Sequence, residues 1–312
     1  MEQVRVAIIG HGHLGRWHTQ KASQLADCKL VAIVEPHNQE AIRASYPEVK
    51  VVSDISQVLD EIDAAVIVTP TSTHFELTKL LLENKKHVFC EKPLCSTVEQ
   101  VEALRPLLGE QKLQVGHSER CHQAWDSVKQ YLSQIDTPKT IKINRFAPFK
   151  GRATDVDVVQ DLMIHDIDLM LFLTGSQPSQ LSSQGFKIRT DKWDHVTSHF
   201  FLENNDQVII TSGRNHVIET RELEIMSREG CLHVDLFHNK ISRGVKDEVS
   251  EGVYVLSEDY EKRDHLLIEQ QAFYQSILQD EKEMVTFEEG ANAVVLVSKV
   301  LESLSKPGLM DV

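Results

Sequence analysis

The chain has 312 residues, which is long for a single hydrophobic core and favours two domains, and its composition of 41% hydrophobic and 26% charged residues is that of an ordinary globular protein. A formal net charge of −14 argues against nucleic acid as a partner, because no basic stripe is present to neutralise phosphates. The sequence contains no apolar run long enough to cross a bilayer and no signal-peptide pattern, so we expect no membrane partner.

The N-terminal part of the chain alternates short apolar runs with helical patterns. We expect a parallel sheet covered by helices, a doubly wound Rossmann domain over residues 1–120, because strands this apolar are buried on both faces. The expected strands are 4–9, 29–34, 50–53, 64–69, 87–90 and 112–116, and the expected helices are 14–26, 38–45, 55–61, 74–84 and 98–109.

The rhythm changes after about residue 121, where strands follow one another without intervening helices. This pattern predicts an α+β domain over residues 121–312 with an open-faced mixed or antiparallel sheet. The two terminal helices are candidates for packing back on the first domain. The expected helices are 124–132, 161–173, 265–279 and 288–305, and the expected strands are 140–146, 195–201, 207–212, 222–227, 231–237 and 240–243.

A glycine-rich turn directly follows the first strand and opens a helix. Its residues, Gly10-His11-Gly12-His13-Leu14-Gly15, match G-x-G-x-x-G, and Glu35 ends the next strand. In this context the pattern predicts a dinucleotide site with the pyrophosphate at the helix N-terminus. Because Glu35 can accept hydrogen bonds from a ribose diol and would repel a 2′-phosphate, we expect NAD rather than NADP. The alternative is a tight structural turn without a ligand.

A second motif, Glu91-Lys92-Pro93, follows the fifth strand, at the strand end where open α/β sheets bind ligands. Lys92 is expected to lie near the nicotinamide and a substrate hydroxyl, with Pro93 fixing the local backbone. A surface Glu–Lys pair is the alternative. The full set of predicted cofactor contacts is Gly10, His11, Gly12, His13, Leu14, Gly15, Glu35, Thr69, Pro70, Thr71, His74, Glu91 and Lys92.

Ionisable residues gather on one apolar helix in the second half of the chain. At 100° per residue Asp161, His165 and Asp168 project within about 60° of one another, while Asp166 points elsewhere. Such groups are costly to bury without a task, and a carboxylate one turn before an imidazole can hold it in a chosen tautomer. The alternatives are a capping aspartate with a buried structural histidine, or two ligands of a metal ion; no metal is expected because nothing nearby completes the set.

These elements in this order resemble the Gfo/Idh/MocA family, that of glucose-fructose oxidoreductase and myo-inositol dehydrogenase. The resemblance covers essentially the whole chain. It implies that Lys92, Asp161 and His165 are the catalytic residues, that the bond before Pro93 is often cis, and that the open sheet face makes homo-dimers or homo-tetramers.

Residues 115–120 and 161–169 resemble a sub-branch of nucleotide-sugar 3-dehydrogenases, including those acting on UDP-N-acetylglucosamine. The chain departs from it where Cys121-His122-Gln123 replaces the usual Phe-Asn-Pro, and where His11 and His13 replace smaller residues. The expected substrate is a sugar, cyclitol or nucleotide sugar. The predicted substrate-binding residues are Lys92, Glu119, Arg120, Arg152, Asp161 and His165.

The predicted activity is NAD-dependent interconversion of a secondary ring hydroxyl and a ketone, with His165 as general acid or base, Asp161 orienting it and Lys92 stabilising negative charge. The alternatives are an NAD-dependent glycoside hydrolase or lyase on the same fold, a dinucleotide-sensing regulatory protein, and a biliverdin-reductase-like enzyme. Five cysteines without C-x-x-C spacing predict reduced thiols and a cytoplasmic location. Arg145, Lys150 and the two tryptophans Trp125 and Trp193 are interpreted as solvated or packing residues when each is taken singly.

Overall fold

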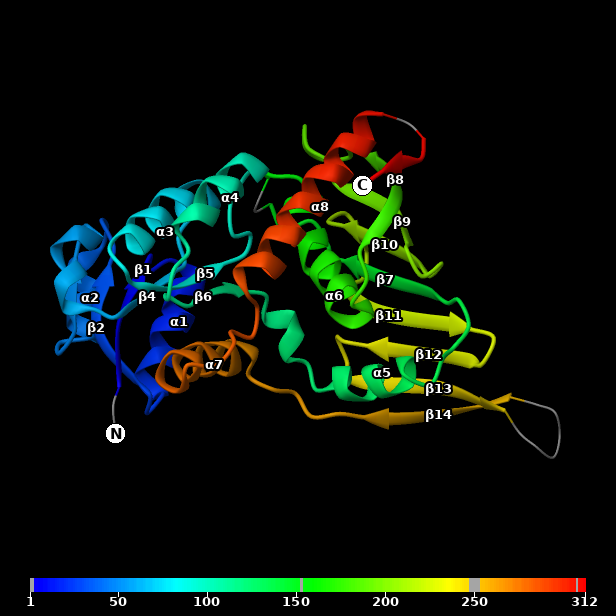
Figure 1. Cartoon of the computed structure of the whole chain (residues 1–312), viewed down its shortest axis with the longest axis horizontal. Helices are drawn as coiled ribbons and strands as arrows, with labels where there is room; N and C mark the ends of the chain where they lie inside the picture. The colour runs from blue at the N-terminus through cyan, green and yellow to red at the C-terminus, as the bar shows by residue number, and fades with distance from the viewer. Residues whose placement is uncertain (1–2, 152–153, 247–252, 307) are drawn as a thin grey trace. The chain divides into compact units, whose positions relative to one another are not determined.

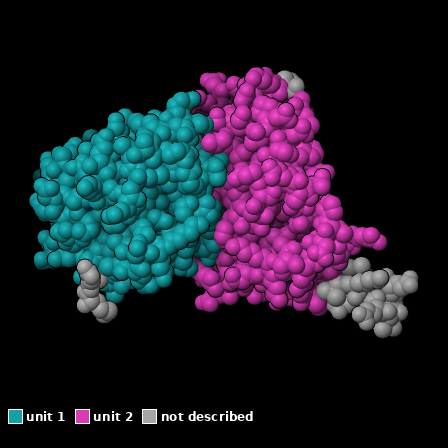
Figure 2. All heavy atoms as spheres, in the orientation of Figure 1, with its two compact units in different colours: residues 1–121, 264–294 teal, residues 122–263, 295–312 magenta. Residues whose placement is uncertain are grey.

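A computed structural model describes residues 3–151, 154–246, 253–306 and 308–312 (Figure 1). The chain divides into two compact units, coloured separately in Figure 2. Unit 1 comprises Met1–Cys121 with Asp264–Val294, and unit 2 comprises His122–Arg263 with Val295–Val312. The first unit is therefore assembled from two segments that are far apart in the sequence. None of the described helices is both long enough and apolar enough to span a bilayer.

Unit 1 is built on a six-stranded parallel sheet with the strand order β3-β2-β1-β4-β5-β6. This is the order of a dinucleotide-binding fold, which places the reversal of strand order, and hence the ligand crevice, between β1 and β4. The strands are β1 (Val4–Ile9), β2 (Cys28–Val34), β3 (Lys50–Val52), β4 (Ala64–Ile67), β5 (His87–Glu91) and β6 (Leu113–Gly116).

Helices cover both faces of this sheet. One face packs on α3 and α4 through buried residues such as Leu81 and Val101, together with the first part of α8. The other packs on α1 and α7, where Ala22, Phe273 and Tyr274 contact apolar side chains of β1, β4 and β5. The helices are α1 (His13–Gln24), α2 (Gln39–Ser45), α3 (His74–Glu83), α4 (Val98–Leu104), α7 (His265–Gln279) and α8 (Phe287–Ser305), of which α8 continues into unit 2.

Unit 2 is a nine-stranded sheet in the order β14-β13-β12-β11-β7-β10-β9-β8-β15. Only β7 and β10 run parallel among its described pairs, so the sheet is mixed. Along β9 every second residue is buried, and α5 and α6 pack on the same sheet (Figure 1). The elements are α5 (Ala124–Leu132), α6 (Ile164–Thr174), β7 (Thr140–Phe146), β8 (Pro178–Phe186), β9 (His195–Leu202), β10 (Gln207–Gly213), β11 (Thr220–Ser227), β12 (Gly230–Asp235), β13 (Lys240–Lys246), β14 (Val253–Asp259) and β15 (Met310–Asp311).

Three local expectations were wrong. The helix expected at 55–61 is two 3₁₀ turns, because the buried Val58 between them leaves the helical region at φ −136° and ψ 5°. Strand β8 was missed because one of its few buried side chains is polar: the Ser183 hydroxyl bonds that of Ser198 in β9 at 2.9 Å, so no apolar alternation marks the strand. Strand β14 was missed because it is an edge strand whose Val255 is exposed.

Candidate functional site

The glycine turn after β1 has the geometry of a phosphate-binding loop. Gly10 has φ +93°, and a Cβ there would lie 2.7 Å from the Val68 carbonyl oxygen, so no other residue fits without strain. A Cβ on Gly15 would lie 2.2 Å from the Gly10 oxygen. A Cβ on Gly12 would meet nothing within 4 Å, so the backbone at the start of α1 faces open space. The amide groups of this helix end are therefore accessible to an anion, as NAD pyrophosphate requires.

Glu35 lies beside this turn, immediately after β2. Its carboxylate accepts hydrogen bonds from the backbone N–H of His11 at 2.9 Å and of His37 at 3.1 Å. The side chain is half-buried, so a face of the carboxylate remains accessible to a ribose diol. The Glu35 carboxylate, a hydrogen-bond acceptor, therefore fits the ribose diol of NAD.

His11 follows Gly10 and is mostly buried. Its ring packs edge-to-face against Tyr46, with the centroids 5.8 Å apart. Burial lowers the pKa of the His11 imidazole, and its Nε2 has no hydrogen-bond partner among the described residues. The neutral His11 ring, whose Nε2 has no hydrogen-bond partner among the described residues, is thus held directly after the first glycine of the motif.

His74 joins the loop after β4 to the loop after β5. Its Nδ1 lies 2.7 Å from the Pro93 carbonyl oxygen and its Nε2 lies 3.0 Å from that of Thr69. The Thr73 hydroxyl donates to the Pro70 carbonyl at 2.9 Å in the same loop, which Thr71 opens as a 3₁₀ turn. The ends of two neighbouring strands are therefore fixed by one buried imidazole.

Glu91 and Lys92 lie at the carboxyl end of β5. The peptide bond between Lys92 and Pro93 is cis. The Glu91 carboxylate accepts from the backbone N–H of Lys92 at 3.2 Å and lies 2.9 Å from His18 Nε2. Glu91 is buried, whereas Lys92 is half-buried, so the ammonium group rather than the carboxylate has access to solvent.

Asp161 and His165 lie at the start of the helix in unit 2. The helix does not begin as an α-helix: Val159–Met163 forms a π-helical turn, and α6 follows from Ile164. The expected spacing of 100° per residue therefore does not apply across Asp161. Such π turns are frequent at functional sites. Both Asp161 and His165 are half-buried, whereas Asp168 is fully buried.

Asp161 lines a small cavity of about 90 Å³ within unit 2. The cavity is rich in arginine, but its cations are engaged. Arg145 makes a buried bidentate ion pair with Asp166, with Nη2–Oδ1 at 2.7 Å, and Arg214 pairs with Asp194 at 2.8 Å. The interpretation of Arg145 as a solvated residue was therefore wrong.

The remaining predicted substrate residues are less accessible or fall outside the described residues. Glu119 and Arg120 lie in a short 3₁₀ turn of unit 1 and are buried. The Arg120 guanidinium pairs with Glu289 of α8 at 3.2 Å. Arg152 lies outside the described residues.

Sequence reasoning missed a buried cluster next to the Glu91-Lys92 element. It consists of His18, three residues after the last glycine of the turn, and Glu269 of α7, both facing Glu91. His18 lies about one turn into the helix that the glycine motif opens, and a histidine at that place is a sequence signal that could have been used. Glu269 has no such signal, because only folding brings α7 against β5.

Together, the parallel sheet, the glycine turn and the carboxylate after β2 define a Rossmann oxidoreductase. A model of the oxidoreductase family with an NAD-binding Rossmann fold matches residues 4–118. The UDP-N-acetylglucosamine 3-dehydrogenase of Acidithiobacillus ferrooxidans is 32% identical over 294 residues, which cover 89% of this chain and 90% of that protein. The chain belongs to the Gfo/Idh/MocA oxidoreductase family, and its nucleotide cofactor is NAD.

Further relatives agree with this assignment. An inositol 2-dehydrogenase of Rhizobium meliloti is 30% identical over 232 residues, covering 68% of this chain and 69% of that protein. A solved structure of the Acidithiobacillus ferrooxidans 3-dehydrogenase matches with a TM-score of 0.87 at 30% identity, covering 97% and 98% of the two chains. The scyllo-inositol dehydrogenase of Lactobacillus casei, solved with NAD(H) and scyllo-inositol, matches in fold with a TM-score of 0.83 at 24% identity, covering 99% of each chain.

Proposed function

We propose that this enzyme oxidises a secondary ring hydroxyl of a nucleotide sugar to a ketone, with a UDP-N-acetylhexosamine as the favoured substrate and carbon 3 as the reacting position. The observation that carries this proposal is the 32% identity to a UDP-N-acetylglucosamine 3-dehydrogenase over nine-tenths of both chains. The inositol dehydrogenases among the relatives support the wider class of polyhydroxylated ring substrates.

Within this proposal the glycine turn and Glu35 hold the NAD. The accessible start of α1 takes the pyrophosphate, and the Glu35 carboxylate takes the adenine ribose diol. Because a 2′-phosphate would place a dianion against this carboxylate, NAD is preferred over NADP. When bound, the nicotinamide accepts the hydride.

Three residues carry the catalytic roles in the proposal. His165 takes the hydroxyl proton as general base, and Asp161 orients the His165 ring and raises its basicity. Lys92 donates a hydrogen bond to the same substrate oxygen and stabilises the negative charge that develops on it. Proton removal and hydride departure together leave a ketone, so one alcohol is oxidised for each NAD reduced.

The proposal extends to organisation. We assign residues 1–120 to cofactor binding and 121–312 to substrate binding and oligomerisation, with α7 contributing to the first domain. The half-exposed face of the unit 2 sheet is the surface through which copies would form a dimer or tetramer. A reducing, cytoplasmic compartment is consistent with the cysteines, since Cys28, Cys90, Cys95 and Cys121 are buried free thiols and Cys231 is exposed and also free.

The test is a substrate panel. The pure protein with NAD is mixed separately with UDP-N-acetylglucosamine, free N-acetylglucosamine and myo-inositol, and absorbance of NADH is followed. We expect turnover with the nucleotide sugar, and much weaker turnover with the free sugar and the cyclitol. Equal or better turnover of myo-inositol would contradict the nucleotide-sugar assignment. Breakdown of UDP-N-acetylglucosamine without net NADH would instead indicate a hydrolase or lyase.

A further inference from the structure

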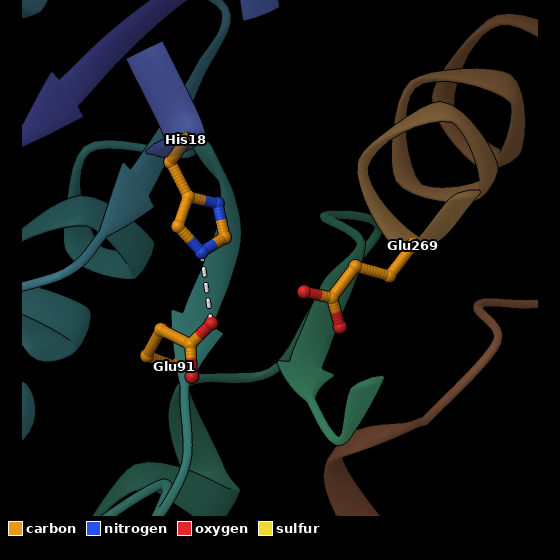
Figure 3. A group of neighbouring side chains, drawn as sticks. All are labelled: His18, Glu91 and Glu269. Atoms are coloured by element: carbon orange, nitrogen blue, oxygen red, sulfur yellow. Dashed lines mark hydrogen bonds and ion pairs between the residues drawn. The ribbon is translucent and has the colours of Figure 1, made fainter. Parts of the chain in front are cut away.

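Three ionisable side chains from separate elements of unit 1 meet in a buried cluster beside Lys92. His18 comes from α1, Glu91 ends β5 and Glu269 comes from α7, and their relative exposures are 0%, 7% and 1%. One nitrogen or oxygen atom of each lies within 4.8 Å of the others. In Figure 3 the carboxyl group of Glu269 points toward Glu91 and His18. The mechanism proposed above uses neither His18 nor Glu269.

The hydrogen bonds around His18 fix its tautomer. The Tyr274 hydroxyl donates to Gln270 Oε1 at 2.8 Å, which directs the Gln270 amide nitrogen to His18. That nitrogen lies 3.1 Å from the His18 carbonyl oxygen, which can only accept, and 2.8 Å from His18 Nδ1. The Nδ1 atom is therefore an acceptor, and the ring carries its hydrogen on Nε2. His18 donates this hydrogen to Glu91 Oε1 at 2.9 Å.

Glu91 is consequently the ionised member of the cluster. Burial raises the pKa of Glu91, whereas the hydrogen bond from His18, the charge that His18 carries when protonated and the nearby Lys92 charge lower it, and the pKa lies below its ordinary value. The backbone N–H of Lys92 donates to the second Glu91 oxygen at 3.2 Å. A Cβ on Gly116 would meet the Glu91 carboxyl carbon at 3.0 Å, so the absence of a side chain at Gly116 leaves room for this carboxylate.

Glu269 is the neutral member. Neither of its carboxyl oxygens has a hydrogen-bond partner among the described residues, and an ionised carboxylate so placed would be very costly. Burial first, and then the charge of Glu91, raise the pKa of Glu269 well above its ordinary value. Two buried carboxyl groups this close together cannot both ionise. The pair therefore keeps one proton, and Glu269 carries it.

A divalent cation is the other way to neutralise two carboxylates and a histidine. The fixed tautomer argues against it, because His18 Nε2 carries a hydrogen and offers no lone pair to a metal. Binding a cation through Nε2 would require the ring hydrogen to move to Nδ1. His18 would then lose the hydrogen bond that Nδ1 accepts from Gln270. The described geometry therefore favours a proton.

We propose that Glu269 is a neutral carboxylic acid that holds its proton toward Glu91, and that Glu269 and His18 are positioning residues for Lys92. Their action passes through Glu91, whose carboxylate binds the Lys92 backbone. A separation of at most 4.8 Å is one that a single water molecule spans. The role of Lys92 in turnover rests on the proposed function, whereas the protonation of Glu269 does not.

The proton can be counted from the pH dependence of unfolding. The folded state keeps a proton that the unfolded chain releases above the ordinary Glu pKa of 4.5, so stability is greatest below that pH and declines as pH rises toward the higher folded pKa. In this window the unfolding equilibrium constant of the wild type should rise about tenfold per pH unit relative to Glu269→Gln. His18, Lys92, Tyr274 and the Cys28 thiol remain in both proteins. Glu91 is coupled to Glu269, but its pKa lies below 4.5, so it is already ionised throughout this window.

The matched control is Glu281→Gln, the same chemical change at an exposed site just beyond α7. It should retain the wild-type pH dependence. Identical pH dependence in wild type and Glu269→Gln would overturn the assignment of the proton. So would a stoichiometric metal ion, found by elemental analysis of the purified protein and lost in Glu269→Gln but not in Glu281→Gln.

The positioning role is tested in the full-length protein with NAD and UDP-N-acetylglucosamine. Glu269→Gln retains a neutral donor of the same shape and should keep kcat within about twofold. Glu269→Leu removes the donor and should lower kcat about tenfold, with the Kd for NAD unchanged. Equal kcat in the two variants would overturn the positioning role. If the wild type does not turn over this substrate, the proposed function fails, while the proton count, which needs only Glu269→Gln, still decides the protonation of Glu269.

Discussion

At the scale of single residues, Glu35 offers the most direct test of cofactor choice. Its carboxylate is held beside the glycine turn by the backbone N–H groups of His11 and His37, so its charge is fixed next to that turn. We expect Glu35→Ser to lose most of its preference for NAD over NADP, because the variant removes the repulsion of a 2′-phosphate together with the diol acceptor. The measurement is the ratio of kcat/KM for the two cofactors, and an unchanged ratio would show that Glu35 does not contact the ribose.

His165 is the residue on which the proposed proton transfer depends. His165→Asn keeps a polar side chain of similar size but cannot take up a proton. Turnover should therefore fall by about 10²–10⁴-fold, the usual contribution of a general base. Binding of NAD, followed by fluorescence titration, should remain as in the wild type. Near wild-type kcat in this variant would remove His165 from the mechanism.

The residue scale is also where the sequence was least informative about charge. Arg145 has the same sequence signature as a solvated cation, yet the fold buries it against Asp166. Nothing local marks this pairing, because the two residues belong to different elements, β7 and α6. In contrast, the tight turn at Gly10 and the position of Glu35 beside it could be predicted, since both follow from strand ends and turn geometry that are visible in the sequence.

At the scale of elements, the Arg145–Asp166 ion pair connects α6, which carries His165, to β7, the central strand of the unit 2 sheet. Both side chains are at least nine-tenths buried. Arg145→Met would remove the ion-pair partner of the buried Asp166 carboxylate, and we expect a loss of about 3–5 kcal/mol in the free energy of unfolding. The double variant with Asp166→Leu should be more stable than the single one, because no charge is left buried. Denaturant titration of the three proteins measures both effects, and a single variant as stable as the wild type would show that the pair is solvated in solution.

The elements themselves were predictable to the extent that apolar periodicity encodes them. The strands of unit 1 are buried on both faces and read as apolar runs, and α5 was predicted with its observed bounds. Strand β8 was not predictable, because its buried Ser183 is satisfied by hydrogen bonds to Ser198 of β9 and to Ser303 of α8 instead of by apolar packing. The π turn before α6 was not predictable either, since residue spacing alone does not distinguish it from an α-helical start.

At the scale of the whole molecule, the nucleotide-binding unit is discontinuous in sequence. Its sheet is covered on one face by α7, whose Phe273 and Tyr274 are fully buried against Val6, Ile8 and Phe89. The alternation of strands and helices in the sequence predicts the parallel sheet. It does not indicate which later helix covers the remaining face of that sheet. That information lies in contacts between segments separated by the whole of the second unit.

This arrangement makes a prediction about fragments. A chain of residues 1–121 retains the glycine turn and all six strands, but it exposes the apolar surface that α7 covers, as well as the buried Glu91 carboxylate. Since each fully buried aromatic side chain contributes about 3–5 kcal/mol, comparable to much of a domain's net stability, we expect this fragment to aggregate or to unfold without cooperativity. Joining residues 264–294 to it through a flexible linker should restore a cooperative thermal transition and binding of NAD, because the helix would again cover the sheet. A fragment 1–121 that folds cooperatively and binds NAD as tightly as the full chain would show that α7 is dispensable to the nucleotide-binding unit.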